Sequence, residues 1–396
     1  MRRYLILVSA VLMQLALGGI YAWSTFVAPL RANYGLATWQ TQLIFGLSIV
    51  FFVLTMLVAG KLLDRKGPRL PAMIGGVLFL AGLVVASLSK GNFVMLLLGY
   101  GVISGTGIGF AYLCPIGTAA RWFPKHKGLI TGVAVAGFGG GAMVLALLAK
   151  SLMAGGMDVL EVFRWVGLGY GAVVILAGLM LVNPPGAKLA HHVEKQPKIS
   201  KDPRFWRIFG AMFAGTFAGL LIIGNLEPMG LVGGVDPLMA ASAVGILALG
   251  NAAGRVLWGL IADKFGRRFS SITSLILLGA SIVILPLSAG WGVGFLVFSA
   301  LVGFNFGAAM VLYATQTSDI YGAEHFGRIY AFVGLSYGIS GLTGPVVGGA
   351  IYDLTGGYWP AIIVATTVSV AGALFYYLMG RHVRRHEELQ KAPETA

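Results

Sequence analysis

Charged residues are scarce in this chain, and their scarcity excludes an ordinary water-soluble fold. Only 11% of the 396 residues are Asp, Glu, Lys or Arg, whereas a soluble domain carries about 25%. Hydrophobic residues make up 57%. A soluble core of this size could not hide so much apolar surface, so lipid must be the solvent for much of it. We therefore expect an integral membrane protein that contacts membrane lipids.

Cysteine is nearly absent as well. The single residue Cys114 cannot form an internal disulfide or a cysteine-rich metal site. The triplet Gly105-x-Gly107-x-Gly109 lies inside an apolar segment with no preceding strand, so it predicts close helix packing rather than a nucleotide-binding loop. The sequence also lacks a Walker loop, a nucleophile triad and a metal-ligand pattern. We expect no enzymatic activity, no cofactor and no metal.

Twelve apolar segments are long enough to cross a bilayer, which takes roughly 20 helical residues. Several contain proline or glycine, which membrane helices tolerate. The sequence therefore predicts an all-α membrane protein with twelve transmembrane helices. Their expected limits are 4–28, 39–62, 70–89, 93–117, 128–153, 163–182, 205–226, 238–262, 269–289, 292–316, 328–351 and 358–380.

Lysine and arginine are unevenly distributed between the loops. With both termini placed in the cytoplasm, 23 of the 28 fall on the cytoplasmic side and 4 on the external side, and Arg255 lies inside a helix. Positive charge accumulates in cytoplasmic loops, so we expect both termini in the cytoplasm and the chain in the plasma (inner) membrane. The same bias explains the net charge of +14 without a nucleic-acid partner.

The longest polar stretch, 183–204, separates two groups of six expected helices. It contains His191 and His192, which we expect to be solvated loop residues rather than metal ligands. The predicted organisation is an N-terminal six-helix bundle at 1–183, a cytoplasmic central linker at 184–204, a C-terminal six-helix bundle at 205–381 and a cytoplasmic basic tail at 382–396.

One polar motif occurs in both halves, at the end of the second helix of each. The stretches that begin at Gly60 and Gly259 both read G-x-x-x-D-[RK]-x-G-x-R and start 199 residues apart. The aspartate can cap a helix N-terminus or pair with an arginine, and the second glycine relieves a tight turn. We predict an inner gate built from Gly60, Asp64, Arg65, Arg69, Asp263, Lys264 and Arg268.

The paired motif is similar to the signature of the major facilitator superfamily, whose transporters consist of two six-helix halves. Further features resemble the oxalate/formate antiporter family and its monocarboxylate transporter relatives. These are the stretch from Gly19 to Leu30, the sequence Arg121-Trp122-Phe123-Pro124 after helix 4, and the sequence Ser318-Asp319-Ile320-Tyr321-Gly322 after helix 10.

This resemblance implies a central site for a carboxylate. In the family, an arginine of helix 8 binds the substrate carboxylate, and the corresponding residue is Arg255. Aromatic residues of helices 1, 4 and 10 line the cavity, and by position they correspond to Tyr21 and Trp23, Tyr112, and Phe306.

Two departures from the family pattern bear on the substrate and on coupling. The oxalate transporter that the chain resembles has a lysine in helix 11 where this chain has Tyr337, and this weakens dicarboxylate transport. Animal monocarboxylate transporters carry an aspartate where this chain has Asn251, which removes the obvious proton carrier. Protons remain a candidate coupling ion, because the substrate itself could enter with one.

Arg255 also stands out from the residues alone. It lies roughly 10 Å from the end of its expected helix, at 1.5 Å per residue, where a charge costs at least ~2.5–3.5 kcal/mol. We find no other Lys, Arg, Asp or Glu comparably deep in an expected helix. A guanidinium binds a carboxylate through two parallel hydrogen bonds, so we predict a substrate-binding arginine. The alternative is snorkelling to the interface or bonding to helix carbonyls.

The remaining polar residues inside expected helices have two open interpretations. Asn251 lies one turn before Arg255 on the same face, where it could bind substrate, orient the guanidinium or join two helices. Tyr21, Tyr112 and Tyr337, together with Asn305, could serve packing or substrate binding, and Phe306 and Met310 would supply an apolar wall.

The sequence favours a secondary transporter of small carboxylates that works by alternating access, with lactate, pyruvate or formate as examples. The alternatives are an oxalate/formate-type dicarboxylate antiporter and a non-transporting membrane sensor on the same fold.

Overall fold

The structure is a computed structural model that describes the chain except residues 1, 125–126, 186–198, 292 and 392–396. Within the helices, the side chains of residues 2, 64, 127–129, 131, 323–328 and 384–391 are also outside the described part. The side chain of Asp64, the residues His191 and His192 and most of the expected linker therefore lie outside the described part, as do residues 392–396 and the side chains of residues 384–391 in the expected basic tail.

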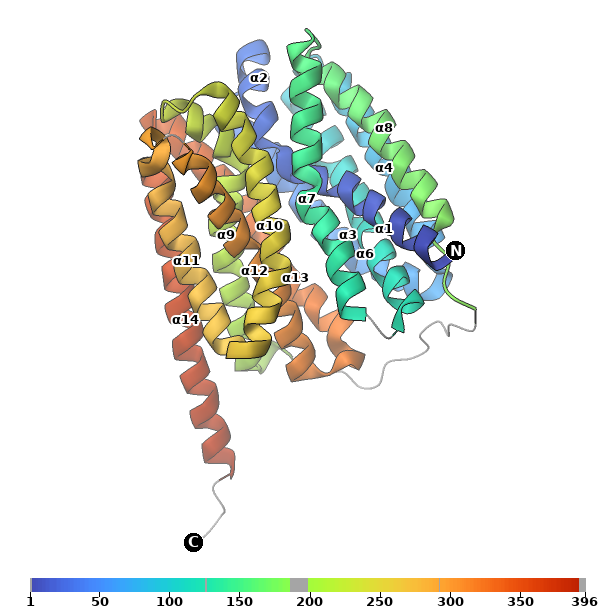
Figure 1. The fold of residues 1–396 in the computed structure, drawn as a ribbon, viewed down its shortest axis with the longest axis vertical. Helices are drawn as coiled ribbons and strands as arrows, with labels where there is room; N and C mark the ends of the chain where they lie inside the picture. Colours follow the sequence, from blue (N-terminus) through green and yellow to red (C-terminus); the bar gives the residue numbers. More distant parts are fainter. Residues whose placement is uncertain (1, 125–126, 186–198, 292, 392–396) are drawn as a thin grey trace.

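The described part of the chain is helical and contains no strand, and twelve of its helices are long and apolar enough to cross a membrane. Two six-helix halves lie side by side, the N-terminal half in blue to green and the C-terminal half in yellow to red (Figure 1). The prediction of an all-α protein with twelve transmembrane helices in two halves is confirmed.

The N-terminal half consists of α1 (Arg2–Gly18), η1 (Gly19–Ala22), α2 (Ser24–Tyr34), α3 (Thr38–Lys66), α4 (Arg69–Ser87), α5 (Phe93–Leu96), the π-helical segment η2 (Leu97–Ser104), α6 (Gly105–Trp122), α7 (Lys127–Ala154) and α8 (Val159–Met180). The C-terminal half consists of η4 (Ile199–Lys201), α9 (Pro203–Val232), α10 (Pro237–Phe265), α11 (Arg267–Leu287), η5 (Ser288–Gly290), α12 (Gly294–Tyr321), α13 (Ala323–Thr355) and α14 (Trp359–Lys391).

The two polar motifs lie at one end of the bundle, which we name the motif end, and the opposite end, at the top of Figure 1, is the distal end. The second glycine of each motif forms the turn expected of it. Gly67 has φ +79° and Gly266 has φ +87°, a region in which a side chain would be strained. Both glycines end a helix by donating a backbone N–H to a carbonyl four residues earlier.

Glycine allows equivalent helices to approach closely in the two halves. A Cβ on Gly105 would lie 2.6 Å from the carbonyl oxygen of Ser48, so α6 touches the backbone of α3. A Cβ on Gly303 would lie 2.0 Å from the carbonyl oxygen of Leu247, so α12 touches the backbone of α10. Ser48 and Leu247 are 199 residues apart, the same spacing as the loop motifs. The predicted packing role of Gly105 is confirmed, and the repeat extends from the loops into the helices.

The first predicted helix is not continuous. The chain bends through the 3₁₀ segment η1, and α2 then runs on to Tyr34, beyond the expected limit of residue 28. The break lies where the first helix crosses α7, because a Cβ on Gly18 would meet the carbonyl oxygen of Phe138 at 2.0 Å. A 3₁₀ stretch within a helix is common at functional hinges. Most other helices also extend beyond their expected limits, and the largest of these extensions take α9 to Val232 and α14 to Lys391.

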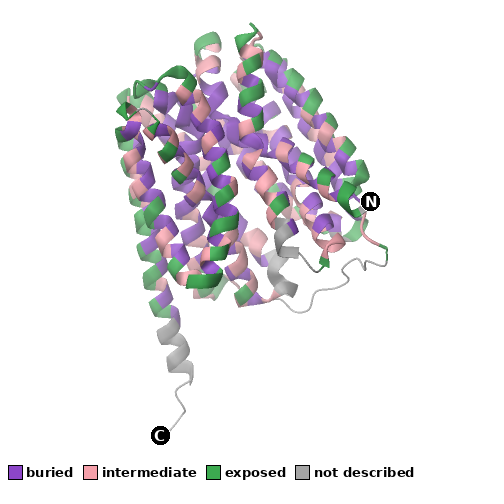
Figure 2. Ribbon diagram, viewed as in Figure 1, coloured by how far each residue is buried: buried purple, intermediate pink, exposed green. Residues whose placement is uncertain are grey.

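The outer surface of the bundle is apolar, as lipid contact requires. Figure 2 shows exposed residues along the outward faces of α8, α11 and α14, with buried residues concentrated inside the halves. Many of those exposed residues are large and hydrophobic, including Trp165, Leu176, Leu277 and Leu374. The halves meet where α3 packs on α13 and where α7 packs on α10. The site described next lies along this interface.

Candidate functional site

Arg255 is buried at the interface between the halves. Arg255 is 4% exposed, so in this conformation its side chain does not snorkel to the surface. The guanidinium donates from Nε to Oδ1 of Asn251, 3.2 Å away, and from Nη1 to the carbonyl oxygen of Val135 in α7, 3.4 Å away. The second contact is the bonding to a helix carbonyl that the alternative interpretation of Arg255 expected. No carboxylate among the described residues forms an ion pair with Arg255. Since a guanidinium carries five N–H donors, it keeps donors for a further acceptor.

Asn251 orients this guanidinium. It lies one turn earlier in α10 and is fully buried. Its Oδ1 accepts from Arg255, while its Nδ2 is buried without a hydrogen-bond partner in the described structure. An amide that lacks a partner in an apolar interior costs free energy, so a substrate oxygen that accepts from Nδ2 would be stabilised. Of the three roles open to Asn251, the geometry supports orientation and leaves a donor for substrate.

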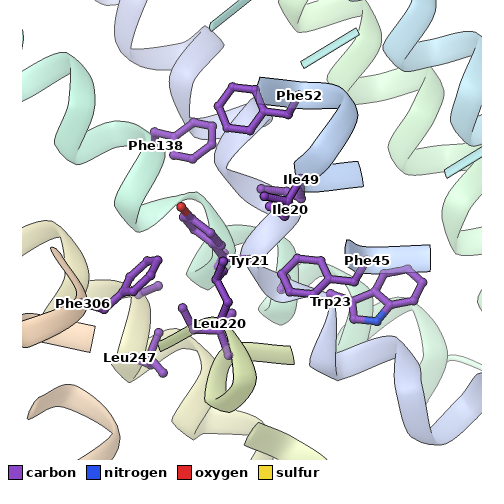
Figure 3. Packing of buried hydrophobic residues seen from close by; sticks show 14 of the residues in the cluster. Ile20, Tyr21, Trp23, Phe45, Ile49, Phe52, Phe138, Leu220, Leu247 and Phe306 are labelled. Carbon is purple, nitrogen blue, oxygen red and sulfur yellow. The ribbon is translucent and has the colours of Figure 1, made fainter. Parts of the chain in front are cut away.

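Aromatic rings surround the charged group. The Phe138 ring centroid lies 5.8 Å from Cζ of Arg255, a cation–π distance. Tyr21 packs edge-to-face on Phe138 and on Phe306, at centroid distances of 5.5 and 5.8 Å. Figure 3 shows the Tyr21 ring between these two phenylalanines, with its hydroxyl pointing away from its own helix. The hydroxyls of Tyr21 and Tyr337 lie 2.8 Å apart and form a hydrogen bond across the halves.

Tyr112 completes the N-terminal wall of the same cluster. Its ring lies 5.0 Å from the centroids of both Phe52 and Phe138. Tyr330 approaches from α13 in the other half, where its hydroxyl donates to the carbonyl oxygen of Met310 at 3.3 Å and lies close enough to interact electrostatically with Arg255. Phe52, Phe138 and Tyr330 are site residues that the sequence analysis missed. An aromatic residue within an apolar helix carries no signal that separates a cavity wall from core packing.

Trp23 and Asn305 were also considered from the sequence. Trp23 is buried inside the N-terminal half, with Phe45, Tyr100 and Phe163 around its ring, and Figure 3 shows it directed away from Tyr21. The implied role of Trp23 in the cavity wall is therefore wrong in this conformation. Asn305 donates to the carbonyl oxygen of Leu301 in its own helix at 2.9 Å, while its Oδ1 is buried without a hydrogen-bond partner in the described structure, so both interpretations of this residue stay open.

Glu227 corrects the expectation that only Arg255 is deeply buried. The expected seventh helix ended at residue 226, whereas α9 continues to Val232 and leaves Glu227 2% exposed. Its Oε1 forms an ion pair with Nζ of Lys150 in α7. Because this pair is neutral overall, Arg255 still provides the uncompensated charge among the described buried residues.

The predicted gate residues of the motif end do not meet across the halves in the described structure. Asp263 pairs with Arg267 at 2.7 Å, and Arg267 also reaches Asp319 at 3.2 Å. Arg268 lies over the Tyr377 ring at 4.9 Å. All these contacts stay within the C-terminal half. Arg267 is a motif residue that the sequence analysis passed over, although it is adjacent to the predicted Arg268.

The N-terminal motif is described only in part. Arg65 and Arg69 are exposed, as is Lys264 of the C-terminal motif. Gly60 is half-buried, and a Cβ there would lie 3.7 Å from Leu113 of α6. The spacing of these residues places them at the motif end, but the described contacts alone do not join them into one gate.

The start of α9 is fixed by a carboxylate that the sequence analysis did not single out. Asp202 caps α9 through the backbone N–H of Arg204 at 2.8 Å, and it accepts from the Tyr321 hydroxyl at 2.9 Å. Burial opposes ionisation of this carboxyl, but hydrogen bonds from Arg204 and Tyr321 outweigh it and lower the pKa of Asp202. The contact explains Tyr321 in the motif after helix 10, because it ties the end of α12 to the start of the C-terminal half.

Taken together, the interface places one buried guanidinium, an unpartnered amide and a hydroxyl pair inside aromatic walls. A guanidinium with free N–H groups binds a carboxylate with fixed geometry. Aromatic walls with a few converging polar groups are typical of small-molecule sites. Among the described residues, no group of three or more metal-ligating side chains occurs.

Comparison with known proteins agrees with this arrangement. The family model described as Major Facilitator Superfamily matches residues 6–233 and 221–396. The chain is 31% identical to the oxalate:formate antiporter of Oxalobacter formigenes, over 98% of this chain and 94% of that protein. It is 29% identical to the uncharacterized MFS-type transporter YhjX of Escherichia coli over 86% of each chain, and 25% identical to mouse monocarboxylate transporter 11, over 81% of this chain and 74% of that protein. These proteins are named as transporters, and the chain belongs to the major facilitator superfamily.

Proposed function

We propose that this protein is a secondary active transporter of small monocarboxylates, such as lactate, pyruvate or formate, that works by alternating access. The substrate carboxylate binds Arg255 between the halves, with Asn251 and the Tyr21–Tyr337 hydroxyl pair beside it. Tyr112 and Phe306 enclose the short apolar part of the substrate. No residue is assigned as a proton carrier, and protons remain a candidate coupling ion.

One observation carries this proposal, namely the buried guanidinium of Arg255 without a carboxylate partner among the described residues. A buried charge that lacks a counter-ion is unfavourable, and an anionic substrate would supply the counter-ion on binding. A carrier of organic cations would need a buried carboxylate at this place instead. The decisive experiment is counterflow in proteoliposomes with a panel of labelled short carboxylates, and accumulation of none of them would contradict the proposal.

A second candidate is exchange of a dicarboxylate such as oxalate. It is favoured by the 31% identity to a protein named as an oxalate:formate antiporter. The contacts of Tyr337 weigh against it, since this residue offers a hydroxyl bonded to Tyr21 rather than a second cation. Competition of unlabelled oxalate against labelled lactate in the same vesicles separates the two candidates.

The proposed orientation places the motif end in the cytoplasm, in the plasma (inner) membrane. It rests on the 23 Lys and Arg residues assigned to that side. We expect a fluorescent or enzymatic reporter fused to the C-terminus, or inserted in the 186–198 segment, to report a cytoplasmic location. A matched reporter in the turn at Gly156 should report the external side. A C-terminal reporter that behaves as external would reverse the assignment.

The paired motifs are proposed to hold the cytoplasmic side closed when the transporter faces outward. If so, Asp263→Asn or Asp64→Asn should shift the population toward inward-facing forms. Exposed ion pairs such as Asp263–Arg267 contribute only about 0–1 kcal/mol, so we expect a shift of roughly two- to fivefold. Cysteine accessibility measured from the two sides of the membrane would detect it. The control is Glu161→Gln, an exposed carboxylate at the start of α8, and unchanged accessibility in both aspartate variants would remove the gating role.

A further inference from the structure

Only two charged residues are buried among those that the structure describes, and the binding site uses one of them. Arg255 lies in the site, whereas Glu227 lies near the distal end of α9. A buried carboxylate needs a partner, since an isolated charge is strongly disfavoured away from water. The position of that partner therefore indicates what Glu227 does.

The partner of Glu227 comes from the other half of the protein. Lys150 lies in the last turns of α7, and its ammonium forms an ion pair with Oε1 of Glu227. The side chain of Lys150 is 38% exposed and that of Glu227 is 3% exposed. The pair therefore exists only while the two halves are in contact at the distal end.

A second carboxylate of the C-terminal half joins the halves at the same end. Asp353, near the end of α13, accepts from the backbone N–H groups of Thr38 and Trp39 at 3.2 and 2.8 Å. These are the first residues of α3, whose N-cap position is held by Ala37, a residue that has no side-chain acceptor. A carboxylate is the preferred cap for exposed helix N–H groups, and here it is supplied from the opposite half.

Further contacts join the two halves at the distal end. Gln42 donates from Nε2 to the carbonyl oxygen of Gly224 at 2.8 Å, and Arg31 lies 5.0 Å over the Tyr352 ring. The hydrogen bonds and the ion pair named above that join the halves lie in the central site or at the distal end. The two ion pairs of Arg267 at the motif end lie within the C-terminal half.

We propose that Glu227 and Asp353 form the distal gate of the transporter, with Lys150 and the N-terminus of α3 as their partners. The C-terminal half supplies both carboxylates, and the N-terminal half supplies a cation and a helix N-terminus. In the proposed orientation this is the extracellular gate, which is closed in this conformation. The inference rests on the proposed alternating access, and it assigns positioning residues outside the substrate site.

Because Lys150 and Glu227 are buried to different extents, we expect their variants to open the distal end to different extents. Lys150→Met strands the carboxylate of Glu227 in an apolar contact, and opening the distal end would hydrate it. Glu227→Gln leaves an ammonium that already reaches solvent, so its effect should be smaller. Removing both charges, in Lys150→Met/Glu227→Met, leaves no stranded group. A buried ion pair replaced by apolar residues is often neutral for stability, so the double variant should close again.

The test measures distances across the distal end by pulsed electron paramagnetic resonance on purified protein in nanodiscs. Spin labels attach at Ala154→Cys and Leu238→Cys, which are exposed and lie in opposite halves, in a Cys114→Ser background. We expect Lys150→Met to increase the long-distance population several-fold, Glu227→Gln to increase it less, and the double variant to match the unmodified protein. A double variant as open as Lys150→Met, or no change in any variant, would overturn the gate.

Asp353 allows a second, independent test of the gate, with a matched control variant. Asp353→Ala should open the distal end, whereas Asp236→Ala should not, because Asp236 caps α10 within its own half through Leu238 and Met239. If both substitutions open the distal end equally, Asp353 is an ordinary helix cap and not part of the gate. These distances need no substrate, so a gate that behaves as expected in a protein that fails carboxylate counterflow would refute the proposed substrate and leave the gate standing.

Discussion

Replacing Arg255 with alanine is expected to abolish carboxylate uptake, and replacing it with lysine to leave little. In Arg255→Ala the substrate anion would enter an aromatic interior with no counter-charge. Removing one partner of a buried charge pair costs about 3–5 kcal/mol, which corresponds to a loss of affinity of at least about 100-fold. Lysine keeps the charge but lacks the planar pair of N–H groups and cannot reproduce the contacts to both Asn251 and Val135.

A second arginine of the C-terminal half provides the control for these variants. Arg207 in α9 donates to the Tyr376 hydroxyl at 3.3 Å and lies 4.6 Å over the ring of that tyrosine, within one half. Arg207→Lys should therefore retain most of the uptake that Arg255→Lys loses. The measurement is initial uptake of labelled lactate in proteoliposomes, normalised to the amount of reconstituted protein. Full lactate uptake by Arg255→Ala would show that this residue does not bind the substrate carboxylate.

The fold was predictable from the sequence because lipid imposes a simple pattern. A span must be apolar over roughly 20 residues, so hydropathy located all twelve helices. It did not locate the break after Gly18, because that break depends on the contact with Phe138 in α7. Nor did it extend α9 past residue 226. Glu227 ended the apolar run in the sequence, and only its pairing with Lys150, 77 positions earlier, keeps it inside the helix bundle.

The candidate site was predictable where burying a residue inside the membrane costs much free energy. Arg255 stood out because a charge at that depth is expensive, and the structure indeed buries it. Tyr21 and Trp23 show the limit of a family resemblance. Residues two apart in a helix do not share a face, and the structure directs Tyr21 to Phe306 and Trp23 to Phe45. Phe138 escaped notice because its role depends on which helix faces Arg255, and the sequence alone does not give that.

Tyr337→Lys is expected to shift the substrate preference from monocarboxylates toward dicarboxylates. On the proposed function, one monocarboxylate would neutralise Arg255, the uncompensated cation among the described buried residues, whereas a dicarboxylate would leave a net negative charge in a medium that penalises it. The hydroxyl of Tyr337 lies 2.8 Å from that of Tyr21, and Phe52 packs on its ring at 6.3 Å. A lysine at this position would place a second cation beside Arg255, and a dicarboxylate would then neutralise both.

The expected result is at least a tenfold rise in the ratio of oxalate to lactate uptake, with lactate uptake reduced because one cation stays unpaired. Tyr337→Phe separates charge from the loss of the hydroxyl. It removes one hydrogen bond to Tyr21, worth about 0.5–1.5 kcal/mol, so lactate uptake should fall only a few-fold and oxalate should gain nothing. Both variants are measured by competition uptake in proteoliposomes. Tight oxalate binding by the unmodified protein, or an unchanged ratio in Tyr337→Lys, would mean that charge balance at this position does not select the substrate.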